Sequence, residues 1–135
     1  MSQVIVFSND AGGVSVCIPT GEISIEAVKE KDTPKGSIIM DSAELPPHND
    51  FFDAFELADG VVTVSLSKAK ELTKKRLRAE REPLLAAQDV AFQRALESGA
   101  DTTAIVAEKQ RLRDITGLVD AVTTLEGLRA IKAGV

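Results

Sequence analysis

Few residues of this chain have side chains suited to catalysis. Its 135 residues include one cysteine, Cys17, and one histidine, His48, the minimum for a thiol nucleophile with an imidazole base. Cys17 stands in an apolar run, where a buried, reduced thiol is the simpler interpretation. A lone cysteine excludes an internal disulfide and a multi-cysteine zinc site, and a lone histidine excludes a histidine pair as metal ligands. We therefore predict no catalytic residue, no cofactor and no metal site.

Two other clusters have the composition of ligand sites but not the spacing. The carboxylates Asp50, Asp53, Glu56 and Asp59 do not match a calcium-binding loop, and we interpret them as keeping an aromatic turn hydrated. Residues 9–13 are rich in asparagine, aspartate and glycine, but they lack the phosphate-binding pattern and precede a strand-like run. This segment predicts a hairpin turn.

A basic cluster lies between residues 68 and 81. It could dock nucleic acid or an acidic partner, or it could be a solvated helix face that balances an acidic first half. The net charge of −5 and the absence of Trp and Tyr argue against a general nucleic-acid binder. Its seven cations are Lys68, Lys70, Lys74, Lys75, Arg76, Arg78 and Arg81.

Charge and composition divide the chain near Leu66. Residues 1–66 hold three lysines and eleven acids, a net charge of −8, whereas residues 67–135 hold thirteen cations and ten acids, a net charge of +3. Four of the five prolines lie in the first part, and the second part is rich in helix-forming Ala, Leu, Arg and Glu. We predict an α+β fold, with a small α+β domain over 1–66 and a helical region over 67–135.

The first part reads as short strands at 4–7, 14–18, 37–41 and 61–65, with a short helix over 24–30 capped by Ser24. The spacing of Phe51, Phe52 and Phe55 predicts one helical turn that faces a core.

The second part reads as helices joined by a tight turn. A long helix begins near Leu66, and Pro83 predicts a kink or a new helix start. Gly99 marks the end of this helix and Asp101 caps the next one, so an antiparallel helical hairpin is expected. Residues 123–126 fit a capping box that opens a short last helix.

No signal peptide and no run long enough to span a bilayer is present, so we expect a cytosolic product without membrane contact. This expectation includes proteins made in a host cytosol and built into a particle.

Several stretches together resemble a group of small tailed-bacteriophage tail proteins, and the resemblance covers nearly the whole chain. The matching stretches are 12–16 with Pro19, 24–26, 31–36, 41–46, 51–56, 76–78, Leu85, 89–95 and 109–115. The chain departs from the pattern at 52–55, where Phe-Asp-Ala-Phe stands in place of Arg-Asn-Ala-Trp. Phe55 can still fill the core position that the pattern gives to Trp. Phe52 cannot make a contact that the arginine of the pattern makes.

The helical part is similar to the C-terminal part of tail-fibre assembly proteins. The resemblance implies a part of a phage tail, or a helper in its assembly, located in the virion or in the host cytoplasm during assembly. It implies a tail-fibre or baseplate partner, and it carries no catalytic residue. Self-association as a dimer or trimer is a further expectation, which depends on the apolar helix faces described next.

Apolar helix faces in so small a domain seldom bury completely, which leaves a surface for a partner or a second copy. The residues predicted to contact a partner are Lys74, Arg78, Leu85, Phe92, Leu96, Ile105, Leu112 and Ile115. Two hypotheses of other classes stay open: a small hydrolase, which would need His48, and a nucleic-acid binder that uses residues 68–81.

Overall fold

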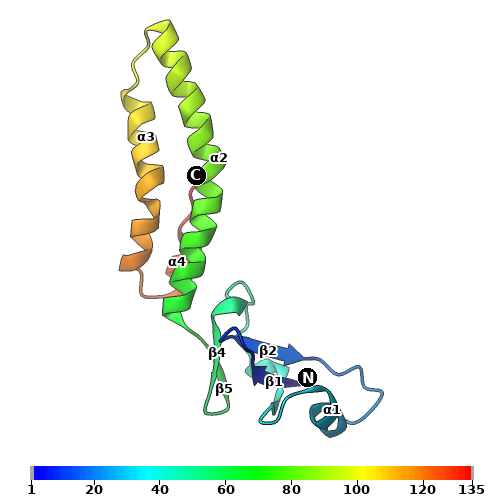
Figure 1. Ribbon diagram of the computed structural model, residues 1–135. Helices are drawn as coiled ribbons and strands as arrows, with labels where there is room; N and C mark the ends of the chain where they lie inside the picture. The colour runs from blue at the N-terminus through cyan, green and yellow to red at the C-terminus, as the bar shows by residue number, and fades with distance from the viewer. Residues whose placement is uncertain (1, 135) are drawn as a thin grey trace. The chain divides into compact units, whose positions relative to one another are not determined.

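The computed structural model describes residues 2–134 (Figure 1). The chain forms two compact units, one ending at Ala69 and the other beginning at Lys70. The first unit holds short strands and one helix, and the second is helical, so the predicted α+β fold class is confirmed. The division lies three residues after the predicted one, because the first turn of the long helix packs with the first unit.

A three-stranded antiparallel sheet organises the first unit, with strand order β2-β1-β3. The strands are β1 (Gln3–Ser8), β2 (Val14–Cys17) and β3 (Ile38–Asp41). Strands β1 and β2 form the predicted hairpin. The side chain of Asn9 holds its turn, because Oδ1 accepts hydrogen bonds from the backbone N–H groups of Ala11 and Gly13 at 3.1 and 3.0 Å.

The two faces of this sheet bury different residues. Val4 and Val6 of β1 belong to a core cluster with Val14, Met40, Phe55 and Val62, which joins the sheet to the next hairpin. Ile5 points to the opposite face and is fully buried. Helix α1 (Ile25–Asp32) contacts β1, and Val28 is its buried residue. Ser24 caps this helix as predicted, accepting from the N–H of Ala27.

A second hairpin, of which the sequence predicts only one strand, completes this unit. Strands β4 (Phe55–Ala58) and β5 (Val61–Val64) pair through a tight turn, in which Asp59 and Gly60 both have positive φ angles of 53° and 77°. The helical turn predicted at Phe51, Phe52 and Phe55 is confirmed only in part. A 3-10 turn, η2 (Phe52–Ala54), forms there, and Phe51 and Phe55 are buried as predicted. Phe55, however, begins a strand, and Phe52 is 38% exposed.

Helix α2 (Leu66–Ser98) dominates the second unit. It continues through Pro83, so the predicted alternative of a new helix start is wrong. Proline deprives the carbonyl of Ala79 of its usual donor, and both residues are exposed, where water can satisfy that carbonyl. The helix ends as predicted at Gly99, whose φ is 70°. The N–H of Ala100 donates to Ala95 O at 2.8 Å in a Schellman motif.

Helix α3 (Thr103–Asp114) returns antiparallel beside α2, and Figure 1 shows the resulting hairpin. The predicted cap at Asp101 is displaced by one residue, because Thr102 is the N-cap and makes no side-chain cap bond. Asp101 instead precedes the cap, and its Oδ1 accepts from the N–H of Thr103 at 3.0 Å. The 3-10 segment η3 (Ile115–Ala121) and helix α4 (Leu125–Ala130) follow. The predicted capping box is wrong. Thr124 is the N-cap and bonds the N–H of Gly127, so the position that the box assigns to an acid is a glycine.

The core of the second unit lies at the end of the hairpin that carries η3 and α4. Its fully buried large side chains include Leu77, Leu112, Val119 and Leu128.

Within residues 2–134, no helix combines the length and the apolar character that crossing a membrane requires.

Candidate functional site

The residues with possible catalytic chemistry are not assembled into a site. Cys17 is half-buried in β2, and His48 is exposed in the loop after η1 (Ser42–Glu44). In the described part of the chain, no hydrogen bond joins the two side chains, and no group of three or more His, Cys, Asp or Glu could hold a metal ion. Of the acidic cluster, Glu56 forms an ion pair with Lys68 at 3.2 Å.

The basic cluster faces several directions and is largely occupied by contacts within each unit. In the first unit, Nζ of Lys68 donates to Gly12 O at 2.9 Å. In the second unit, Lys70 reaches the carbonyl of Asp120, and Lys74 forms an ion pair with the carboxylate of Asp120 at 2.9 Å. The hydrogen bond and charge of Lys74 lower the pKa of Asp120.

Two arginines of the cluster bond the carbonyl ends of the neighbouring helices. Nη2 of Arg76 donates to Leu128 O at 3.2 Å and to Ile131 O at 2.7 Å, at the end of α4. Nη1 of Arg81 donates to Arg113 O at 3.0 Å, at the end of α3. Helix ends carry unpaired carbonyls and partial negative charge, so cations are stabilising there.

Glu80 of α2 bonds both Arg76 and the backbone of the C-terminal segment. Its Oε1 accepts from the N–H of Ala133 at 3.1 Å, and Oε2 pairs with Arg76 at 2.6 Å. These contacts lower the pKa of Glu80, the bond from Ala133 contributing most. Arg111 of α3 donates to Ala133 O at 2.9 Å, so Ala133, itself fully buried, is held from both helices.

The cluster therefore has a structural role that its sequence indicates only in general terms. Lys75 and Arg78 are the cations among its seven that are exposed and have no partner among the described contacts. Lys75 and Arg78 alone do not form the continuous row of cations that binding a nucleic-acid phosphate backbone requires.

The eight residues predicted to contact a partner divide by burial. Leu112 is fully buried and Ile115 is 2% exposed, so these two belong to the core and are not available to a partner. Leu112 lies near the end of α3, and Ile115 is the first residue of η3, an element that the sequence pattern did not predict. Lys74 is engaged with Asp120, and Arg78 is exposed.

The other four lie on the distal part of the hairpin, away from η3 and α4. Leu85, Phe92 and Ile105 are half-buried, and Leu96 is 59% exposed. Lys109 covers the Phe92 ring, with Nζ 5.1 Å from the ring centroid, and forms an ion pair with Asp89 at 2.7 Å. Through these two contacts Lys109 joins α3 to α2 in the distal part of the hairpin.

Further exposed apolar residues lie on the hairpin and were not predicted from the sequence. Val90 on α2 and Val106 on α3 are each 50% exposed. The signal was present in the sequence: Pro83, Ala86, Ala87 and Val90 form a second apolar stripe at helical spacing, and all four are exposed. Between Leu84 and Ser98, all of which the structure describes, Ala95 is the one buried residue. The distal hairpin thus lacks the covering layer that α4 supplies to the proximal part.

Comparisons of the chain with protein-family models, with curated proteins and with solved structures found no significant match.

Proposed function

We propose that this chain is a non-enzymatic bacteriophage tail protein that docks a tail-fibre or baseplate protein through the distal part of its helical hairpin. The proposal is supported by the ordered series of stretches that resemble small phage tail proteins. It is also supported by the similarity of the helical part to tail-fibre assembly proteins.

One structural observation carries the proposal. Leu96, Val90 and Val106 are all half-exposed or more, and they lie on the distal part of the hairpin, where no third element of the described residues covers α2 and α3. Exposed apolar side chains concentrated on one part of a molecule are typical of protein interaction sites, and apolar helix surfaces bind other helices. The proximal part of the same hairpin shows what such a layer does. There Leu77 of α2 and Leu112 of α3 are completely buried, together with Leu128 of α4.

The proposal includes two fates for the protein. A structural subunit stays in the virion, whereas an assembly chaperone leaves before the virion is complete. Both fates need the same docking surface, since each requires specific contact with a tail component.

Quantitative mass spectrometry of purified virions, together with infected cells, tests the proposal. A fixed copy number relative to the major tail protein would support a structural subunit. Absence from virions with abundance in infected cells would support a chaperone. Absence from both would overturn the proposal.

A further inference from the structure

The outer edge of strand β3 presents unpaired backbone groups. The N–H of Ser42 donates to Ser2 O, which makes these two residues a hydrogen-bonded pair of the antiparallel ladder. Such pairs recur at every second residue, so the backbone N–H and C=O groups of Met40 and Ile38 also point toward β1. The N–H and C=O groups of Ile39 therefore point away from β1. Within residues 2–134, no other strand pairs with this edge.

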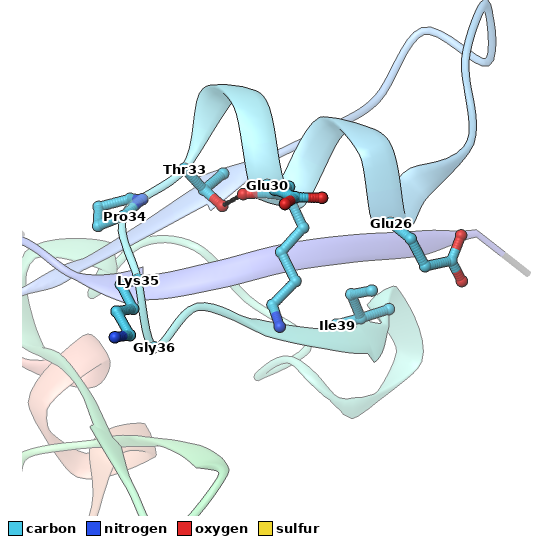
Figure 2. Close-up of a pocket in the computed structure, with 8 residues that line it drawn as sticks. Glu26, Glu30, Thr33, Pro34, Lys35, Gly36 and Ile39 are labelled. Carbon is cyan, nitrogen blue, oxygen red and sulfur yellow. Dashed lines mark hydrogen bonds between the residues drawn. The ribbon is translucent and has the colours of Figure 1, made fainter.

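A surface cavity of about 420 Å³ lies beside this edge, between β3 and helix α1. Figure 2 shows the side chain of Ile39 below the helix, with Glu26 and Lys35 at opposite ends of the view. Ile39 supplies an apolar floor and is only half-buried. The free backbone edge and the cavity are thus neighbours, and a strand added at the edge would place its side chains against the cavity.

The charges along this edge change sign from one end to the other. Lys35 precedes β3, whereas Asp41 ends the strand and Glu44 follows it in η1. In the cavity itself, Lys29 and Lys35 are balanced by Glu26 and Glu30. Within the described part of the chain, the side chains of Lys35, Asp41 and Glu44 take part in no ion pair. An antiparallel copy of the same strand would therefore bring the basic end of each edge against the acidic end of the other.

We propose that a second copy of this chain pairs with the first, antiparallel, through the β3 edges. Ile39 of each copy lies opposite Ile39 of the other, and the two three-stranded sheets become one continuous six-stranded sheet. Opposed aliphatic side chains are favourable cross-strand neighbours, and the two-fold arrangement closes the assembly at a dimer. The self-complementary charges favour a second copy over an unrelated peptide.

Sedimentation of the full chain over a range of concentrations tests this pairing. The wild-type protein should show a concentration-dependent dimer. Lys35→Glu places like charges at both ends of the edge and should weaken the dimer about tenfold. Adding Glu44→Lys to this variant restores opposite charges and should recover the affinity. Lys75→Glu, an exposed cation of α2 without a described partner, is the matched control and should leave it unchanged.

A second variant addresses the strand contact directly. Ile39→Lys places two ammonium groups at the two-fold position and should abolish the dimer, with far-UV circular dichroism showing whether the sheet is retained. A wild-type chain that remains monomeric at all concentrations would overturn the proposal. Loss of the dimer on Leu96→Glu but not on Lys35→Glu would overturn it too, and would assign self-association to the hairpin.

Discussion

Arg76 and Ile131 are 55 positions apart in the chain, and the guanidinium of Arg76 donates to the carbonyl of Ile131 at 2.7 Å. The same group bonds Leu128 O, so one side chain of α2 holds the end of α4. From the sequence, Arg76 could belong to a basic docking surface. In the structure it stabilises the C-terminal end of α4.

Replacing Arg76 tests this structural role. Arg76→Ala leaves two helix-end carbonyls and Glu80 without their charged partner, and we expect a loss of about 1–2 kcal/mol in the free energy of unfolding. Urea unfolding followed by circular dichroism measures the loss. Arg78→Ala, which removes an exposed arginine two residues along the same helix, should change stability by less than about 0.5 kcal/mol. Equal effects of the two variants would contradict the assignment.

Glu80 predicts a pH-dependent contribution to stability. Its pKa is lowered from the ordinary value of 4.5, chiefly by the bond from the Ala133 N–H and then by Arg76. A carboxyl group whose pKa is lower in the folded state stabilises the fold above the unfolded-state value. That stabilisation is lost as pH falls through the folded-state value.

The contribution of Glu80 can be isolated by subtraction. Wild type should be more stable than Glu80→Gln near neutral pH, and the difference should shrink as pH falls below 4.5. Unfolding curves at several pH values measure this difference. Glu82→Gln, at an exposed position two residues away, should show no such trend. A stability difference for Glu80 that grows toward acid would mean that folding raises the pKa of this carboxyl instead of lowering it.

Local signals in the sequence were enough to predict most elements of the fold. The first hairpin and α1 depend on side chains that bond nearby backbone groups, Asn9 and Ser24. The helix end at Gly99 depends on the positive φ of a glycine. Strand β4 was missed because Phe51, Phe52 and Phe55 fit a helical spacing. The alternation that marks the strand, Phe55-Glu56-Leu57, is too short to outweigh it.

The docking surface was harder to predict than the fold, because burial depends on distant residues. Leu112 and Leu96 are both leucines on apolar helix faces, yet one is fully buried and the other 59% exposed. What separates them is the position of η3 and α4, which cover one end of the hairpin. That position depends on bonds such as Arg76 to Ile131, which no local pattern reveals.

The contrast between these leucines can be measured. Leu112→Ala leaves a cavity in the core and should cost about 2–5 kcal/mol. Leu96→Ala removes a mostly exposed side chain and should cost less than about 0.5 kcal/mol in the isolated protein. Chemical denaturation of both variants measures the loss in the free energy of unfolding for each. A large loss for Leu96→Ala would mean that the distal hairpin is covered in the free protein.

The turn at Gly99 offers a test of the hairpin itself. Gly99 has a φ of 70°, and a Cβ there meets no atom within 4 Å, so the strain of Gly99→Ala is in the backbone alone. We expect a loss of about 1–2 kcal/mol. Gly117→Ala is the matched control, since that glycine also has open space but no positive φ, and it should be close to neutral. Thermal melting of both variants measures the contrast, and an equal drop in both would refute the conformational explanation.

The proposed docking surface predicts a separation of binding from stability. Leu96→Glu and Val106→Glu place charges on exposed positions of the hairpin, so each variant should fold like the wild type. Each should nevertheless bind its tail-fibre or baseplate partner at least about tenfold more weakly, because a carboxylate buried in an apolar interface loses its hydration without gaining a partner. Titration calorimetry with the purified partner measures the affinity. Val61→Glu changes a 54% exposed valine of β5 in the first unit and should leave binding intact. Weakened binding in that control alone would place the docking surface on the first unit instead.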